Sequence, residues 1–262
     1  MMLDPSNPFY WAILVIGGLV CGLLNTLASS GTAVSLPLLI LFLGMNEGVA
    51  NATNRLPVLV GAVMAALTFA RRGEMDWSAA ARLVPPAAAG SILGVYAAEA
   101  LTDRQLEHFV NGAVLIALVL LFTKLKKILS KSDGRLPTLH WRGMLMVFFV
   151  GFWLGFIVLD GATYLLLILM LVFYYDLPQA NALKNLLIAV TSLLPVLIFA
   201  HSGKILWVEG GVLALGSIVG GYVGARMSSL PGARQLAFKA LAFVISIELV
   251  QLVWRATAPL RA

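Results

Sequence analysis

The feature that most constrains this chain is an internal duplication, because residues 48 to 110 reappear 130 positions later without an insertion. The clearest matches are Ala50-Asn51-Ala52 with Ala180-Asn181-Ala182, Phe69-Ala70 with Phe199-Ala200, Gly73 with Gly203, Trp77 with Trp207, and Gly90 and Gly94 with Gly220 and Gly224. A three-residue gap further upstream also aligns Gly18 and Gly22 with Gly151 and Gly155. We therefore expect two structurally related halves.

The composition is that of an integral membrane protein. Sixty percent of the residues are hydrophobic and only 11% are charged, and the apolar runs are too long and too many for the core of a soluble domain. Only a helix satisfies every backbone polar group within one segment of a bilayer, so we predict an all-α polytopic fold. The single cysteine, Cys21, excludes an intramolecular disulfide.

The apolar runs predict about five hydrophobic segments in each half of a single membrane domain, 1–262. The expected segments are 9–27, 31–44, 48–70, 78–98 and 106–123 in repeat 1 (9–123), and 143–159, 161–175, 178–200, 207–225 and 236–254 in repeat 2 (143–254). The second segment of each repeat is short for a full crossing. The first two segments of each repeat therefore form either two crossings or a re-entrant hairpin.

The distribution of Lys and Arg predicts the orientation, because these residues accumulate on the cytoplasmic side. With the N-terminus outside, twelve basic residues fall in inner loops and four fall outside. The polar stretch 124–142 becomes a cytoplasmic linker, and an odd number of segments per half makes the repeats inverted. We expect a multi-pass protein of the cell inner (plasma) membrane, in which the net charge of +6 reflects topology and requires no nucleic acid.

The third segment of each half carries polar residues that share one helical face. The spacing i, i+3, i+4 holds for Asn51, Asn54 and Arg55, and again for Asn181, Lys184 and Asn185. A cation inside a span costs a few kcal/mol unless it finds water, a partner or an anionic ligand. One interpretation is that both cations extend to the headgroups. The other is that both face one shared anion site.

A polar break separates the first two segments of each half. Ser30 and Gly31 belong to the first break, whereas Asp160, Gly161 and Thr163 belong to the second. A helix that begins after such a break directs unpaired N–H groups at whatever lies before it, which suits an anion. The alternative is that small residues merely allow close helix packing.

Two acidic residues are candidates for proton coupling. Glu248 lies in the middle of the last segment and corresponds to Leu118 in the first repeat, while Asp160 lies in the second break. Glu248 could equally be a neutral structural side chain. No cluster of His, Cys or acidic residues has metal-ligand spacing, and no nucleophile motif or phosphate loop is present, so we expect no metal, no cofactor and no enzyme activity.

The chain resembles the sulfite exporter TauE/SafE family. The resemblance rests on the glycine-bearing breaks, the short Ser35-Leu36-Pro37 segment and the stretch from Ala50 to Asn54. The chain departs from the family in having Ala28-Ser29-Ser30-Gly31 in place of a denser glycine run, and in lacking a second proline that matches Pro37. The resemblance implies transport of a small sulfur-containing or organic anion, such as sulfite or a sulfonate.

The sequence therefore favours a secondary transporter that moves a small anion by alternating access. Arg55 and Lys184 would supply positive charge, the four asparagines would orient the anion, and the two breaks would add donors. An anion channel is the nearest alternative and would use the same residues, and an intramembrane enzyme is a weaker one. The expected partners are the anionic substrate, the lipid bilayer and, as a further candidate, a second copy of the chain in a homodimer.

The charge count predicts that both termini lie outside and that the linker is cytoplasmic. A cysteine introduced as Ser132→Cys should therefore be inaccessible to an impermeant thiol reagent in intact cells and accessible in inverted vesicles. The unsubstituted chain, with Cys21 inside an apolar run, provides the background. Labelling of Ser132→Cys in intact cells would reverse the orientation.

Overall fold

The computed structural model describes residues 6–102, 105, 136–157, 161–228, 230, 232, 235 and 239. The predicted segments 106–123 and 236–254, most of the linker 124–142, and the candidates Asp160 and Glu248 lie outside these residues. Throughout the described part the regular structure is helical, which confirms the all-α prediction. The elements are α1 (Pro8–Ala28), α2 (Thr32–Pro37), the π-helix η1 (Leu38–Phe42), α3 (Glu47–Thr53), α4 (Arg55–Arg71), α5 (Trp77–Glu99), α7 (Trp141–Phe156), α8 (Gly161–Leu171), α9 (Leu177–His201) and α10 (Trp207–Ser228).

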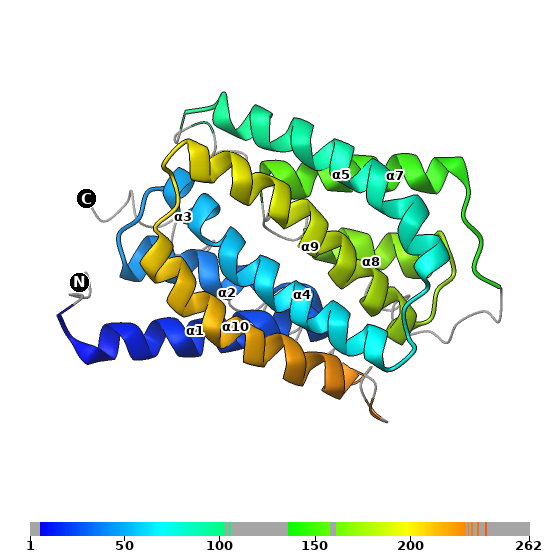
Figure 1. Ribbon diagram of the computed structural model, residues 1–262, viewed down its shortest axis with the longest axis horizontal. Coiled ribbons are helices and arrows are strands. Elements are labelled where there is room, and N and C mark those ends of the chain that lie inside the picture. The colour runs from blue at the N-terminus through cyan, green and yellow to red at the C-terminus, as the bar shows by residue number, and fades with distance from the viewer. Residues whose placement is uncertain are drawn as a thin grey trace, which may run out of the picture.

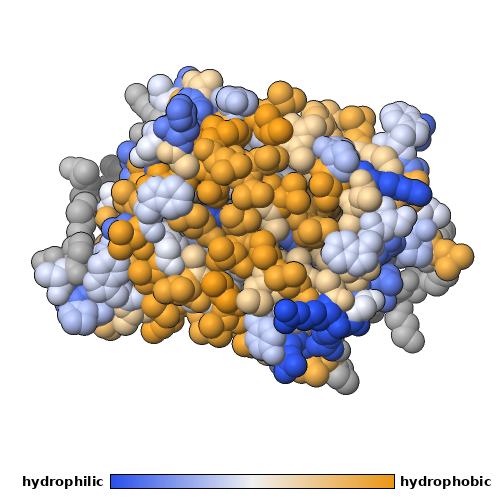
Figure 2. Space-filling model, viewed as in Figure 1, coloured by the Kyte–Doolittle hydropathy of each residue, from blue (hydrophilic) through white to orange (hydrophobic). Residues whose placement is uncertain are grey.

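Four stretches in the described part are long and apolar enough to cross a bilayer: Pro8–Leu27, Glu47–Arg71, Leu177–His201 and Trp207–Ser228. Figure 2 shows hydrophobic residues over the middle of the molecule and more hydrophilic ones towards its two ends, as expected of a protein surrounded by lipid. The helices run roughly along the long axis in Figure 1. Their length and surface therefore fit a membrane protein.

The predicted segment 48–70 corresponds to the stretch Glu47–Arg71, within which the helix is interrupted at Asn54 between α3 and α4. Pro57 has no backbone N–H, so the carbonyl of Thr53 loses its usual donor one turn later. The matching segment in the second half, α9, has no proline at this place and is continuous. Likewise, η1 follows directly after Pro37, which lies inside α2. Prolines thus account for both irregularities.

Glycines pair helices from opposite halves of the chain. A Cβ atom added to Gly18 would lie 1.9 Å from the Leu213 carbonyl oxygen of α10, and one added to Gly216 would lie 2.0 Å from that of Val15 in α1. Helices α5 and α7 are packed in the same way as α1 and α10, since a Cβ on Gly94 of α5 would lie 2.0 Å from the Phe152 carbonyl oxygen of α7. These glycines let two backbones touch, which is the packing role that their spacing suggested.

The pairing produces two groups of helices. One group, here called the α4 unit, contains α1, α4 and α10, and the other, the α9 unit, contains α5, α7, α8 and α9. In Figure 1 the α4 unit lies below and the α9 unit above, and α4 packs against α9 where the two units meet. The α4 unit therefore contains α1 and α4 of the first half with α10 of the second, and the α9 unit contains α7, α8 and α9 of the second half with α5 of the first.

The turns gather at the two ends of the molecule. The α4–α5 turn, the start of α7 and the α8–α9 turn lie at the right in Figure 1, whereas the start of α1 and the α9–α10 turn lie at the left. Hydrogen bonds tie neighbouring turns at each end: the Thr138 N–H donates to the Phe173 carbonyl at 3.2 Å, and the Leu206 N–H donates to Thr53 Oγ1 at 3.1 Å. Arg71, Arg72 and Arg142 belong to the right-hand end, which we call the basic end.

Matched glycine substitutions should separate packing glycines from tolerant ones. Gly94→Ala should destabilise the protein by about 1 to 3 kcal/mol, because the new methyl group would overlap the α7 backbone. Gly211→Ala, where the added Cβ meets nothing within 4 Å, should be neutral or stabilising by up to about 1 kcal/mol. Thermal unfolding in detergent measures both, and equal melting temperatures would contradict the packing.

Candidate functional site

The end of α7 is buried, and its carbonyl groups need donors from elsewhere. The last four carbonyls of any helix lack intrahelical partners. In α7 the Trp153 carbonyl accepts from the Ile157 N–H at 2.8 Å, and the Phe156 carbonyl accepts from Asn51 Nδ2 at 3.3 Å. The remaining two carbonyls, of Leu154 and Gly155, accept from Arg55. Polar residues of α3 and α4 thus satisfy a helix end that belongs to the other half of the chain.

Arg55 is the first of two buried cations. Its side chain is fully buried, and Nη2 donates to the Gly155 carbonyl at 2.8 Å while Nη1 donates to that of Leu154. The guanidinium carbon also lies 5.8 Å from the centre of the Phe199 ring. The C-terminal end of a helix carries a partial negative charge, so it attracts a cation. These contacts hold the guanidinium between α7 and α9.

Lys184 is the second buried cation, and it binds the end of α1. Its ammonium Nζ lies 2.9 Å from the Asn25 carbonyl oxygen, 3.1 Å from the Thr26 carbonyl oxygen, 3.0 Å from Ser29 Oγ and 2.9 Å from Asn181 Oδ1. Three N–H groups thus face four oxygens. The carbonyls belong to the last turn of α1, which has no intrahelical donors for them. Each cation therefore closes the first helix of the opposite half.

The two polar breaks contact each other beside Lys184. Thr163 Oγ1, in the first turn of α8, donates to the Ser29 carbonyl at 3.2 Å and lies 3.3 Å from Ser30 Oγ. Ser29 has a positive φ of 62°, an uncommon conformation for a residue other than glycine. This left-handed residue ends α1 and turns its own carbonyl and hydroxyl towards α8 and α9.

Several buried polar atoms beside the cations have no hydrogen-bond partner among the described residues. They are Asn54 Nδ2 and Oδ1, Arg55 Nε, Asn181 Nδ2 and Asn185 Oδ1. Buried polar groups are normally paired, and an unpaired one costs about 1 to 3 kcal/mol. Three of these atoms are donors, and each lies on a cation or on an asparagine within three residues of one. Unused donors beside buried positive charge are the groups that bind an oxyanion.

The structure brings the predicted residues into two groups. Lys184, Asn181, Ser30 and Thr163 gather at the end of α1, together with Asn185, whose Nδ2 donates to the Asn181 carbonyl at 2.8 Å. The second group forms at the end of α7 and contains Asn51, Asn54 and Arg55. Both cations have 0% exposure, which does not fit the alternative that they extend to the headgroups.

The predicted glycines lie where the chain passes close to other atoms. A Cβ on Gly31 would lie 2.0 Å from the Cys21 carbonyl oxygen, and one on Gly161 would lie 2.4 Å from a Leu154 methyl carbon. Gly31 precedes α2 and packs against α1, and Gly161 begins α8 and packs against α7, so each glycine lets the chain after a break approach the helix before it.

Sequence reasoning missed the atoms that bind the cations. Four of the acceptors are backbone carbonyls, of Asn25, Thr26, Leu154 and Gly155, and a backbone atom leaves no trace in the choice of side chain. From the sequence we expect the N-terminal ends of α2 and α8, which follow the breaks, to form the site. The cations instead bind the C-terminal ends of α1 and α7, which precede the breaks. Ser29 could have been identified from the sequence, because it is a polar residue directly after an apolar helix.

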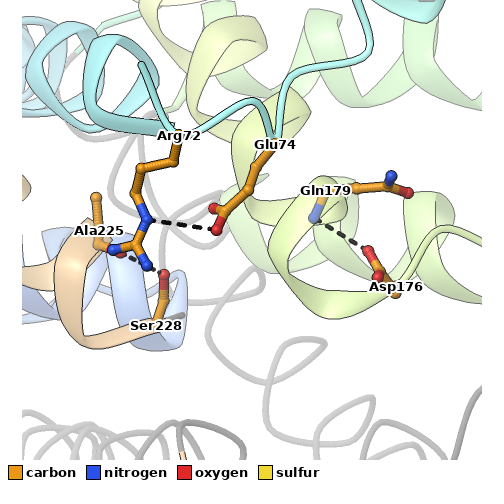
Figure 3. A network of polar contacts seen from close by, with 6 residues as sticks. All are labelled: Arg72, Glu74, Asp176, Gln179, Ala225 and Ser228. Carbon is orange, nitrogen blue, oxygen red and sulfur yellow. Dashed lines mark hydrogen bonds and ion pairs between the residues drawn. The ribbon is translucent and has the colours of Figure 1, made fainter. Parts of the chain in front are cut away.

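At the basic end a hydrogen bond joins residues of the two halves. The Tyr175 hydroxyl donates to Asp76 Oδ2 at 2.8 Å, and Asp76 Oδ1 accepts from the Ala79 N–H as the N-cap of α5. The Ala79 N–H and then the Tyr175 hydroxyl lower the pKa of the Asp76 carboxyl below its ordinary value, because both stabilise the carboxylate. Nearby, Figure 3 shows Arg72 paired with Glu74, at 3.5 Å, beside the last turn of α10.

The chain is similar to known membrane transporter proteins. Residues 14–249 match the family described as sulfite exporter TauE/SafE. A probable membrane transporter protein of Haemophilus influenzae is 29% identical over 222 residues, which cover 84% of this chain and 86% of the relative. The probable membrane transporter protein ORF9 of a Sinorhizobium species is 25% identical, with 95% of both chains covered. No solved structure matches the chain.

These matches define a membrane transporter. Since the family match extends over most of its length, the chain belongs to the sulfite exporter TauE/SafE family. A bilayer environment and a small substrate follow from that membership, and the names of the family and of the relatives indicate a transporter and not an enzyme.

The Asp76 carboxyl predicts a pH dependence at the basic end. A carboxyl with a lowered folded-state pKa adds stability above its unfolded pKa of about 3.9, and this stability is lost as the pH falls through the folded value. Asp76→Asn should therefore lower the melting temperature at neutral pH, with a difference that shrinks below about pH 4. Tyr175→Phe should show a smaller effect of the same sign. A difference that is constant between neutral and acidic pH would contradict this.

Proposed function

We propose that this chain is a multi-pass secondary transporter of the inner membrane that moves a small sulfur-containing or organic anion by alternating access. The carrying observation is the pair of fully buried cations, Arg55 and Lys184, which have equivalent neighbourhoods in the two halves. Among the described residues their hydrogen-bond acceptors are carbonyl, hydroxyl and amide oxygens and include no carboxylate. Dipoles reduce the cost of a buried charge without neutralising it, so an anion would gain energy there.

The unpaired donors indicate how the anion would bind. Arg55 Nε and Asn54 Nδ2 belong to neighbouring residues, and Asn181 Nδ2 belongs to the amide whose oxygen already binds Lys184. Oxygens of sulfite, a sulfonate or a carboxylate accept such hydrogen bonds, and charge-assisted ones are the strongest. The unpaired acceptors, Asn54 Oδ1 and Asn185 Oδ1, would suit a protonated oxygen of the substrate.

The cations also suggest how binding would be linked to movement. Arg55 of the α4 unit binds the end of α7 in the α9 unit, and Lys184 of the α9 unit binds the end of α1 in the α4 unit. Neutral hydrogen bonds lie within each unit, such as Ser217 Oγ to the Pro57 carbonyl at 2.6 Å and Ser91 Oγ to the Thr191 carbonyl at 2.8 Å, and also between the units, as from Thr163 Oγ1 to the Ser29 carbonyl. An anion that competes for a cation would loosen the contact between units, and rocking of the units would then expose the site to one side.

This mechanism assumes inverted repeats whose first two segments form hairpins. Supporting observations are the buried tips, the equivalent cation contacts and the exchange of α5 and α10 between the units. Glu248 and Asp160 are retained as proposed proton-coupling residues, and a homodimer as a proposed assembly. The linker 124–142 would join the two repeats on the cytoplasmic side.

Neutralising either cation should weaken anion binding. For Arg55→Gln and Lys184→Gln we expect a loss of about 1.5 to 3 kcal/mol, or roughly 10- to 100-fold in affinity, the range for a hydrogen bond to a charged group. Isothermal titration of the purified protein with sulfite, thiosulfate and small sulfonates measures the affinity. Arg142→Gln is the matched control, because it removes an exposed charge at the basic end.

Two roles are possible for the cations, closing helix ends or binding the anion, and they predict different results for the two variants. If Arg55 and Lys184 only closed helix ends, the folded variants would lose thermal stability and bind the anion as tightly as the wild type. Unchanged affinity in both variants would therefore contradict the anion site. In proteoliposomes, saturable uptake with counterflow indicates a carrier, whereas ohmic current would indicate the channel alternative.

A further inference from the structure

The surroundings of Lys184 Nζ have the composition of a metal-cation site. Two backbone carbonyls from a helix end, one hydroxyl and one amide oxygen surround it at 2.9 to 3.1 Å. All are neutral oxygen ligands, the type that alkali cations take in proteins, and carbonyls at the C-terminal ends of broken helices are a recurrent source of them. A lysine ammonium normally needs at most three acceptors, one per N–H, whereas here it has four.

The two carbonyl oxygens are placed by the fold independently of the lysine. The Asn25 and Thr26 carbonyls are directed out of the last turn of α1, because α1 ends at Ala28. The left-handed conformation of Ser29 places its hydroxyl on the same side, and its carbonyl is held by Thr163 Oγ1. The backbone carbonyl of Asn181 accepts from Asn185 Nδ2, within the same helix as its amide oxygen. Removal of the ammonium would therefore leave a group of oxygens with no donor.

The geometry points to a monovalent-cation site at the end of α1, in which the Lys184 ammonium takes the place of a free ion. A potassium ion and an ammonium group are similar in size, so the oxygens are spaced for K⁺ or NH₄⁺. An ion bound there would join α1 of one unit to α9 of the other, as Lys184 does. In the wild type the tethered ammonium fills the site, and binding of a free cation is not required.

This inference is independent of the proposed anion, since it concerns only the oxygens around Nζ. It predicts that Lys184→Ala creates a site for a free cation. The melting temperature of this variant should rise with KCl or NH₄Cl in a saturable way, following the logarithmic dependence expected of a ligand that binds the folded state. Choline chloride at the same ionic strength should give no rise, because choline is too large. Chloride is the anion in every sample, so anion effects cancel.

Two further variants make the test specific. Lys204→Ala, which removes a lysine from the α9–α10 turn, should melt at the same temperature in KCl and choline chloride. The double variant Lys184→Ala with Ser29→Gly removes one of the four oxygens while glycine accepts the left-handed backbone. It should need at least severalfold more KCl for half of the stabilisation.

Melting temperatures in the three salts distinguish the possible outcomes. Saturable stabilisation of Lys184→Ala by K⁺ or NH₄⁺, weakened by Ser29→Gly, supports the site. Equal melting temperatures in KCl, NH₄Cl and choline chloride overturn it. Failure of Lys184→Ala to fold in all three salts also overturns it, because a cation in the site should restore the contacts that the ammonium makes. Loss of anion affinity without any cation effect would leave the proposed function intact and contradict this inference alone.

Discussion

The structure depends on satisfying two helix ends inside an apolar protein. In water, the carbonyls at the ends of α1 and α7 would bond to solvent, but at this depth they need donors from the chain. Arg55 and Lys184 provide those donors from the opposite half, and Asn51 completes the set at α7. A buried cation and a buried helix end are each costly alone, and their contact reduces both costs. The same contacts place positive charge in the centre of the molecule.

Close backbone packing decides which helices carry these ends. Gly18 and Gly216 bring α1 against α10, and Gly94 and Gly155 bring α5 against α7, so α10 and α5 each pack against the first helix of the other half. The Ser91 and Ser217 hydrogen bonds reinforce each unit internally, whereas both cations act between units. In the proposed mechanism the interface between the units changes during the cycle, and polar contacts between units meet that need better than the interlocked glycine pairs do. The proposed mechanism follows from this division.

The two cations differ in whether any of their N–H donors remain unpaired. Lys184 uses its whole donor capacity on four oxygens, while Arg55 keeps Nε unpaired beside the unpaired amide of Asn54. The Arg55 group is therefore the better candidate for direct contact with an anion, and the Lys184 group resembles a cation site. The two cations are one residue apart in the repeat register, since Arg55 aligns with Asn185 and Asn54 with Lys184, and one is a planar guanidinium whereas the other is a compact ammonium.

The sequence by itself determined the class of protein, the duplication, the approximate helices and the buried polar residues, since these follow from apolar length, repeat register and helical periodicity. It could not determine which helix ends the cations meet, because backbone carbonyls of Leu154 or Asn25 have no side-chain signal. Nor could it show that Asn54 interrupts a helix, an effect of where Pro57 leaves the Thr53 carbonyl. The tertiary structure decided that Arg55 and Lys184 serve separate helix ends, because the packing of the two units along α4 and α9 places each cation beside the first helix of the other half.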